Sequence, residues 1–330
     1  MVGAFLPPLF KALITDRSRP NTSSRRRRRS HRYGCATLAF LWLLHASSCG
    51  AFTGVVLKSK DLSPYDLAIH GFKTELQGLE MRLLEVDASE GARAQIVSRI
   101  MAEAPSFVLC LGTEALELAG SLGNVPRVFC LVPYSKAQSL VSLGNTRGVT
   151  IDIPSSIQFE VLTRALPKAR RIGVMYDPQS SVKIISRATR DAERLHLELL
   201  ARPVHSIKDV PLALSYLSEK MDVLWSIFDS TAYGSETARY ALLQTLKRDI
   251  PFMGFSPQFV KAGAILALYG DYEDMGRQAA ALAISLLNHT EAEEPIVEPR
   301  SVHIAVNTKV SEAMKIRFSP EFLQTVNESY

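Results

Sequence analysis

Polar side chains stand directly after several apolar runs of this chain, where they could bind a small charged or polar solute. A hydroxyl or a backbone N–H at the start of a helix suits a ligand carboxylate, and an ionised Asp229 would suit an ammonium group. The candidates of this kind are Ser59, Gly112, Thr113, Asp229, Ser230, Thr231 and Ser256. Tyr65, Tyr176 and Tyr269 could offer ring faces to an apolar or cationic part of the ligand. The alternative for each hydroxyl or carboxylate is that it caps a helix.

Common motifs for catalysis or for a resident cofactor are absent from the sequence. It contains no Walker A loop, no Gly-x-Gly-x-x-Gly and no His-Glu-x-x-His. The segment Gly254-Phe255-Ser256-Pro257-Gln258 begins like the nucleophile elbow of a hydrolase but lacks the closing glycine. The histidines are scattered without the spacing of metal ligands. We therefore predict a binding protein with no catalytic residue, no cofactor and no metal, and an exported hydrolase on an α/β scaffold remains an alternative.

Strands and helices that alternate along the chain must position these candidates. The first series predicts strands at 52–59, 81–86, 106–111 and 128–132, with helices at 65–76, 92–104 and 115–120. The second series predicts strands at 171–176, 197–204, 222–228 and 252–255, with helices at 182–195, 210–218 and 236–248. Such alternation is typical of parallel sheets with right-handed crossovers. We predict an α/β fold with two Rossmann-like lobes, each built on a parallel sheet.

The tail of the chain indicates that it passes between the lobes more than once. A strand at 265–269, a helix at 272–287 and a strand at 302–306 follow the second series. We predict that lobe 1 comprises 52–150 plus 270–299 and that lobe 2 comprises 151–269 plus 300–330, joined by a multi-crossing hinge. Open parallel sheets bind their ligands beyond the carboxyl ends of the strands, and most of the candidates follow a predicted strand.

The start of the chain has the features of an export signal. Five arginines, Arg25 to Arg29, precede an apolar run at 36–44 and the small residues at 46–51. A basic region, a short apolar region and small residues are typical of a secretory signal peptide, and the apolar run is too short to span a bilayer. We predict that residues 1–50 are a signal peptide with an N-terminal extension. A nucleic-acid-binding patch is the alternative for the arginines.

Charge supports the first of these interpretations. The chain is formally +5, but residues 1–48 carry nine Lys and Arg and one Asp, so the remainder is formally −3. We therefore expect no nucleic-acid partner for the mature protein.

The cysteines leave two alternatives each. Cys49 follows Ala46-Ser47-Ser48, which loosely resembles a bacterial lipoprotein box, so it is either lipidated or lost with the leader. Cys110 and Cys130 lie in two predicted apolar strands. Buried thiols that pack as small apolar side chains are the favoured interpretation, and a disulfide in an oxidising compartment is the alternative.

Several short segments share a pattern with one known protein family. They are 56–59, Tyr65 with Gly71-Phe72-Lys73, 109–116, 145–150, 166–178, 259–264, 272–280 and 306–309. Together they resemble the ABC-transporter substrate-binding proteins with a periplasmic-binding-protein-like I fold, over residues 52–327. The chain departs from the family pattern at Asp177, where Asn is frequent, and in the loop 58–61, which is more charged than usual.

The resemblance implies a protein that captures a small organic ligand, such as an amino acid and notably an aromatic one, between two closing lobes. It implies delivery of that ligand to an ABC permease in the membrane. Carried over by position, Ser59, Tyr65, Gly112, Thr113, Tyr176, Asp229, Ser230 and Thr231 would line the cleft. We expect a monomer in the periplasm, either unanchored or held by a lipid on Cys49. A ligand sensor for a membrane signalling receptor is the main alternative.

Overall fold

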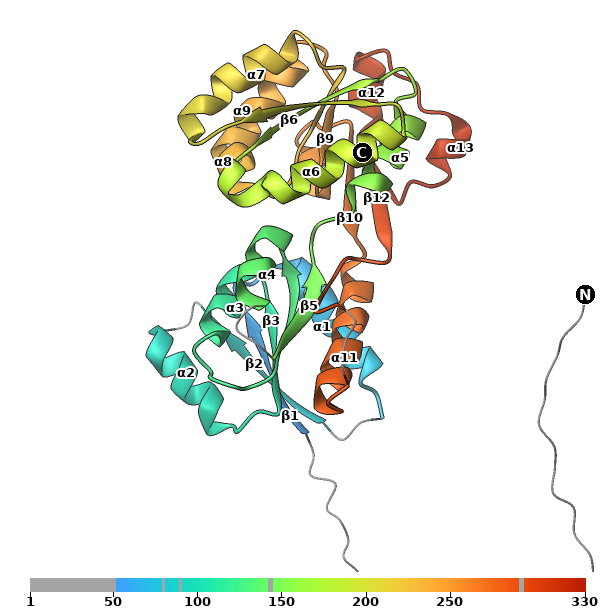
Figure 1. The fold of residues 1–330 in the computed structure, drawn as a ribbon. Helices are drawn as coiled ribbons and strands as arrows, with labels where there is room; N and C mark the ends of the chain where they lie inside the picture. Colours follow the sequence, from blue (N-terminus) through green and yellow to red (C-terminus); the bar gives the residue numbers. More distant parts are fainter. Residues whose placement is uncertain (1–51, 79–80, 89–90, 142–144, 291–293) are drawn as a thin grey trace, which may run out of the picture. The chain divides into compact units, whose positions relative to one another are not determined.

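The strands of the protein form two sheets (Figure 1). The computed structural model describes residues 52–78, 81–88, 91–141, 145–290 and 294–330. The predicted signal peptide at 1–50, Cys49 included, lies outside the described residues. We give the name sheet A to the six-stranded sheet, which contains the first described strand. The seven-stranded sheet is sheet B.

Sheet A has the strand order β11-β5-β4-β3-β1-β2, and all its pairings are parallel. Its strands are β1 (Phe52–Lys58), β2 (Met81–Asp87), β3 (Phe107–Leu111), β4 (Arg127–Val132), β5 (Thr146–Thr150) and β11 (Ile296–Val297). β3 is buried along its whole length. A strand covered on both faces needs apolar side chains on both, which explains the unbroken apolar sequence of this segment.

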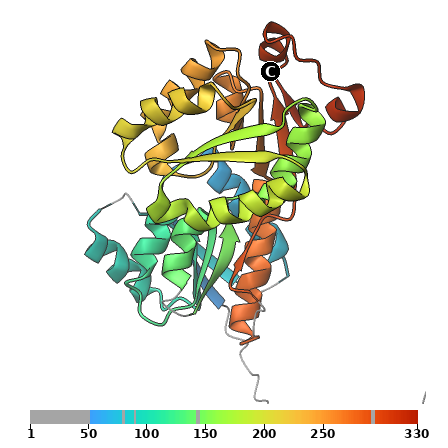
Figure 2. The same cartoon turned by 45° about the horizontal axis from the view of Figure 1, so that its top comes forward.

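Helices cover both faces of sheet A. On one face lie α1 (Ser63–Glu75) and α11 (Tyr272–Leu287), and on the other α2 (Arg93–Ala102), α3 (Thr113–Ala119) and α4 (Tyr134–Val141). α1 and α11 lie side by side although they are far apart in the sequence, as Figure 1 and Figure 2 show. Their inward side chains, among them Phe72 and Met275, share one core with the sheet.

Sheet B has the strand order β13-β12-β10-β9-β8-β6-β7. Its strands are β6 (Arg171–Tyr176), β7 (Glu198–Pro203), β8 (Val223–Trp225), β9 (Phe252–Gly254), β10 (Leu266–Gly270), β12 (Val302–Val306) and β13 (Glu328–Ser329). The prediction of parallel sheets is confirmed apart from one pairing, because β12 runs antiparallel to β10. The chain re-enters sheet B at the Gly270 end of β10, where Val302 is the register partner, so β12 must run back along that strand.

The helices that accompany sheet B share one continuous core with it. They are α5 (Ser155–Ala165), α6 (Pro178–Arg194), α7 (Val210–Ser218), α8 (Ser230–Tyr233), α9 (Ser235–Leu246), α10 (Pro257–Lys261), α12 (Thr308–Ala313) and α13 (Pro320–Leu323), with a short 3-10 helix at Ile207–Asp209. Phe159 and Trp225 meet edge to face inside this core, with ring centroids 4.9 Å apart. Such pairs add about 1 kcal/mol beyond the burial of their area.

The chain passes between the two sheets at three points, which we name the crossings. The first joins β5 to α5, the second joins β10 to α11, and the third joins β11 to β12. The crossings place residues 151–154, Asp271 and 298–301 between elements of different sheets.

Some elements lie where the sequence predicts none. α4 and β5 fill the stretch between β4 and the first crossing, and β5 escapes detection because Thr146, Arg147 and Gly148 interrupt its apolar pattern. α8 begins at Ser230, where we predict a loop. Asp229 explains this difference, because its side chain accepts hydrogen bonds from the first turn and starts a helix of four residues.

Cys110 and Cys130 are buried free thiols on the neighbouring strands β3 and β4. In the register of the two strands Cys110 is opposite Phe129 rather than Cys130. Burial raises the pKa of each thiol to about 12, which keeps both protonated at neutral pH. The interpretation as small apolar side chains is confirmed.

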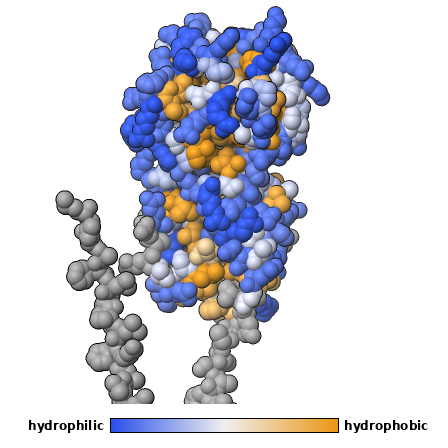
Figure 3. All heavy atoms as spheres, turned by 90° about the vertical axis from the view of Figure 1, so that its right-hand side faces the viewer, coloured by the Kyte–Doolittle hydropathy of each residue, from blue (hydrophilic) through white to orange (hydrophobic). Residues whose placement is uncertain are grey.

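Hydrophilic residues predominate on the face of the molecule shown in Figure 3, where apolar residues gather in separate patches. The exposed apolar side chains of the described residues include Leu212, with 77% of its surface accessible. Among the helices that the structure describes, none has both the length and the apolar character of a membrane span.

Candidate functional site

In each sheet the strand order reverses at one point. This switch point lies between β1 and β3 in sheet A and between β6 and β8 in sheet B. Ligands of open parallel sheets bind in the crevice outside the strand ends at such points. The two switch points are therefore the expected positions of a ligand site, and most of the binding residues predicted from the sequence lie near them.

Ser59, Tyr65 and Gly112 pack together at the switch point of sheet A. The Ser59 hydroxyl accepts a hydrogen bond of 2.9 Å from the backbone N–H of Ala115 in α3, and it also bonds the Tyr65 hydroxyl. Gly112 has a φ of +86°, and a Cβ there would lie 2.2 Å from the Tyr65 oxygen, so only glycine fits. Burial raises the pKa of Tyr65 to about 12. These polar groups bond one another and the start of α3.

Asp229 is a buried carboxylate that organises the switch point of sheet B. Its Oδ2 accepts hydrogen bonds of 2.7 Å from the backbone N–H of Asp177 and from the Ser181 hydroxyl. Its Oδ1 accepts from the N–H groups of Thr231 and Ala232, at 3.0 and 2.9 Å. The Thr231 hydroxyl in turn donates to Oδ2 of Asp177 at 2.9 Å. Asp229 therefore caps α8 and holds the β6–α6 turn against the β8–α8 turn.

A cavity of about 680 Å³ lies where strand ends of both sheets meet, and we name it the strand-end cavity. On the side of sheet A it is lined mainly by α3 and α4, which follow β3 and β4, and on the side of sheet B by the segments that follow β6, β8 and β9. Four predicted residues line it, namely Thr113, Asp229, Ser230 and Thr231. Residues outside the predicted set of binding residues also line it, among them Glu114, Glu117, Lys136, Asp177, Phe228 and Phe255.

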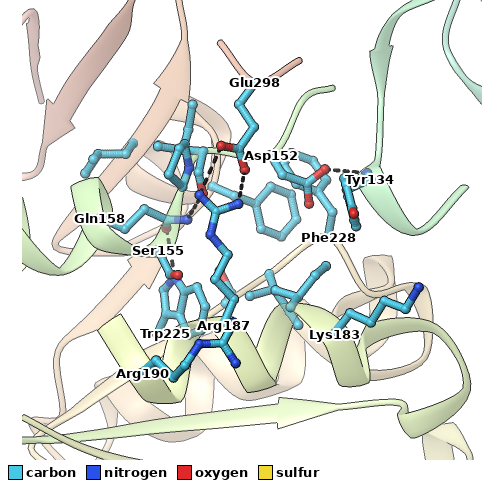
Figure 4. Close-up of a pocket in the computed structure, with 17 residues that line it drawn as sticks. Tyr134, Asp152, Ser155, Gln158, Lys183, Arg187, Arg190, Trp225, Phe228 and Glu298 are labelled. Atoms are coloured by element: carbon cyan, nitrogen blue, oxygen red, sulfur yellow. Dashed lines mark hydrogen bonds and ion pairs between the residues drawn. The ribbon is translucent and has the colours of Figure 1, made fainter. Parts of the chain in front are cut away.

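A second cavity of about 230 Å³ lies beside the crossings, and we name it the crossing cavity. Figure 4 shows its lining, which combines charged groups with aromatic rings. The charged residues are Asp152 and Glu298 from two crossings and Lys183, Arg187 and Arg190 from α6. The aromatic residues are Tyr134, Trp225, Phe228 and Phe255.

An ion pair spans the crossing cavity. Two guanidinium nitrogens of Arg187 donate to the two carboxylate oxygens of Glu298 (Figure 4). The bond to Glu298 raises the pKa of Arg187 above its ordinary value. Gln278 of α11 donates to the backbone oxygen of Glu298, which anchors the third crossing to sheet A. The pair therefore connects α6 of sheet B with the chain that leaves sheet A.

Phe228 and Phe255 form the wall that the two cavities share. Both residues line both cavities, and their ring centroids are 4.1 Å apart. The sequence predicts both as strand residues, within 222–228 and 252–255. The strands end earlier, at Trp225 and Gly254, so the two rings lie beyond the strand ends, where a ligand can reach them.

Six predicted residues line neither cavity. Besides Ser59, Tyr65 and Gly112, these are Tyr176, Ser256 and Tyr269. Tyr176 packs against the core of sheet B. Ser256 precedes α10 without a capping bond from its side chain, and the buried Tyr269 donates its hydroxyl proton to Glu328. A binding role for these six remains a prediction.

Asp152 in the crossing cavity links protonation to stability. Burial raises the pKa of its carboxyl from 3.8 to about 7, although a hydrogen bond of 2.6 Å from the backbone N–H of Tyr134 opposes the shift. Between these two pKa values the folded state binds more protons than the unfolded state. Stability contributed by this group is therefore present at low pH and is lost as pH rises towards 7.

We predict that Asp152→Asn removes this pH dependence, because the amide keeps an acceptor for Tyr134 but does not ionise. Between pH 5 and pH 8 the free energy of unfolding of the unmodified protein should fall by about 2–3 kcal/mol more than that of the variant. Urea denaturation at both pH values measures this difference. Parallel pH profiles for the two proteins would show that Asp152 ionises normally.

Known proteins are similar to this chain in sequence or in fold. A tyrosine-binding protein of Clostridioides difficile (strain R20291) is 23% identical to this chain over 231 residues. The match covers 67% of this chain and 66% of that protein, which is just under two thirds of the relative's length. The ABC domain from Streptococcus pneumonia in complex with L-Trp is 17% identical, with a TM-score of 0.63 over 84% of this chain and 99% of that one. A ligand-free, open substrate-binding protein with adhesive properties from Clostridium difficile is 17% identical, with a TM-score of 0.65 over 84% and 98%.

The fold is that of the periplasmic-binding-protein-like I class, in which two α/β units are joined by several chain crossings. Residues 66–329 match the family described as ABC transporter substrate binding protein. The chain belongs to that family, as its sequence motifs predict.

Proposed function

We propose that this protein is exported, captures a small organic ligand such as an amino acid between two lobes, and delivers it to an ABC importer. The lobes are 52–150 plus 270–299 and 151–269 plus 300–330. Residues 1–50 act as the signal peptide, and the mature monomer works in the periplasm beside a membrane permease. Cys49 is its candidate lipid anchor.

One observation carries this proposal. The strand-end cavity is lined by the carboxyl ends of strands from both sheets, so a ligand there would contact both lobes at once. A ligand that binds two bodies better together than apart shifts them towards the closed arrangement. The three crossings would absorb this hinge motion.

The nature of the ligand is supported by the site and by the relatives. The Phe228–Phe255 pair offers ring faces, and hydroxyls of Thr113, Ser230 and Thr231 offer polar contacts. Tyrosine and L-Trp are the ligands named for two similar proteins. An amino acid or a related small organic solute is the ligand class that fits these features.

A thermal-shift screen of amino acids, short peptides and small organic acids tests the proposal. At a concentration of 100 times Kd, a ligand should stabilise the folded state by about 2.7 kcal/mol, which raises Tm by several degrees. Phe228→Ala should reduce the ligand-induced shift, because it removes half of the aromatic wall. Tyr240→Ala, on α9 outside both cavities, is the matched control and should leave the shift unchanged. The absence of any stabilising ligand across the panel would contradict the proposal.

A further inference from the structure

The strand-end cavity and the crossing cavity carry opposite charge. Four carboxylates line the strand-end cavity against one ammonium group, that of Lys136. The lining of the crossing cavity includes three cations, Lys183, Arg187 and Arg190, and two acidic residues, Asp152 and Glu298. Within the described residues, neither Asp177 nor Asp229 forms an ion pair with a basic side chain, whereas Glu114 pairs with Lys60 at 3.9 Å.

The positive charge of the crossing cavity comes mainly from Arg190 and Lys183. Arg187 and Glu298 neutralise each other through two hydrogen bonds. Lys183 bonds the neutral amide of Gln138 at 2.9 Å. Arg190 forms no hydrogen bond or ion pair with any described residue, although it lines the cavity. Asp152 offsets part of this charge, because burial raises the pKa of its carboxyl to about 7 and leaves it only partly ionised at neutral pH.

The two cavities adjoin, and their boundary is apolar. Phe228 and Phe255 line both. A further cavity of about 370 Å³ borders both, since it shares Ser180 with the strand-end cavity and Lys183 with the crossing cavity. One molecule could therefore extend past the Phe pair with its two ends in surroundings of opposite charge.

We propose that the ligand is a short zwitterion whose ammonium and carboxylate groups are separated by an apolar body, with a dipeptide bearing an aromatic or branched side chain as its simplest form. The ammonium end lies in the strand-end cavity, and the carboxylate end lies near Arg190. A free α-amino acid carries both charges on one carbon and so cannot place them on opposite sides of the Phe pair. This inference rests on the proposed function and narrows its ligand class.

Isothermal titration calorimetry with the purified protein tests the ligand class directly. The probes are L-phenylalanyl-L-phenylalanine, its N-acetyl derivative, its C-terminal amide, and free phenylalanine, tyrosine and tryptophan. A charge-assisted hydrogen bond changes affinity by about tenfold or more. The dipeptide should therefore bind at least about tenfold more tightly than its N-acetyl derivative, its amide or any of the free amino acids.

Two substitutions test the orientation. Arg190→Gln should weaken binding of the dipeptide about tenfold and leave binding of its amide unchanged. Glu117→Gln, on the exposed surface of α3, should weaken binding of the dipeptide and leave binding of its N-acetyl derivative unchanged. The matched controls are Arg239→Gln and Glu236→Gln, both exposed on α9 and outside both cavities. They should leave the affinity for every probe unchanged.

The outcomes separate the ligand class from the general function. Free amino acids that bind as tightly as the dipeptide would overturn the inference and leave the proposed function standing. If the Arg190→Gln and Glu117→Gln variants bound the dipeptide as tightly as their controls do, that result would also overturn the inference and leave the proposed function standing. If neither the dipeptide nor any amino acid bound, the result would overturn this inference and count against the proposed function as well.

Discussion

Gly276→Ala is expected to lower the free energy of unfolding by about 3 kcal/mol or more. At this position α11 lies against α1, and a Cβ would be 2.0 Å from the backbone oxygen of Ala68 and 2.9 Å from the backbone nitrogen of Phe72. Both neighbours belong to a helix backbone, so neither can turn aside. The clash far exceeds the gain of about 1 kcal/mol that alanine normally brings to a helix. Thermal unfolding should show a Tm lower by about 6–12 °C.

Gly71 shows that the close approach is reciprocal. A Cβ on this residue of α1 would lie 1.9 Å from the backbone oxygen of Glu273 in α11. Gly123→Ala is the control, because it meets no heavy atom within 4 Å but keeps a φ of +62°. The control substitution should lower the free energy of unfolding by only about 1–2 kcal/mol, because it adds backbone strain and no clash. A Gly276→Ala protein as stable as the unmodified one would mean that α1 and α11 are not in contact.

Asp229→Ala is expected to cost about 4 kcal/mol of stability and to abolish ligand binding. The substitution leaves four donors at the switch point of sheet B without an acceptor, two of them backbone N–H groups of α8. Loss of the cap should also release Phe228, which directly precedes Asp229 and lines both cavities. Urea denaturation and calorimetry measure the two effects.

Asp61→Ala provides the matched control for this prediction. Its carboxylate is 84% exposed and approaches Lys58 only at 3.5 Å. A surface ion pair of this kind contributes at most about 1 kcal/mol. If Asp229→Ala lowered the free energy of unfolding no more than Asp61→Ala does, the Asp229 carboxylate would not be holding the β6–α6 turn against the β8–α8 turn.

The order of the elements could be predicted because buried parallel strands leave a clear pattern in the sequence. β3 is apolar throughout and is followed by Gly112, after which the next helix starts at once. β5 could not be predicted in the same way, because Arg147 and Gly148 break its pattern. The pairing of α1 with α11 depends on Gly71 and Gly276, and nothing in either local segment indicates that the two glycines face each other.

The candidate site could be predicted in part, from the rule that strand ends position ligands. This rule led to Thr113 and to Asp229, which the structure places at the strand-end cavity. It could not separate residues that face a cavity from those that bond one another, as Ser59 and Tyr65 do. That distinction depends on neighbours from other parts of the chain.

The crossing cavity illustrates the same limit. Lys183, Arg187 and Arg190 follow the spacing of one helix face within the predicted helix 182–195, which is a signal that the sequence contains. Which of these charges is paired depends on Glu298, which lies 111 positions from Arg187 and reaches it only because the third crossing passes beside α6. Sequence spacing indicates the basic face, and only the fold shows what lies opposite.

The central claim is that a small organic ligand binds between the two sheets, and a crystal structure of the protein purified without denaturation from its native cells tests it most directly. We expect electron density for one small molecule that contacts the Phe228–Phe255 pair together with a residue beside sheet A such as Thr113. Cavities filled by the protein's own side chains, with no density after soaking with amino acids and dipeptides, would contradict it.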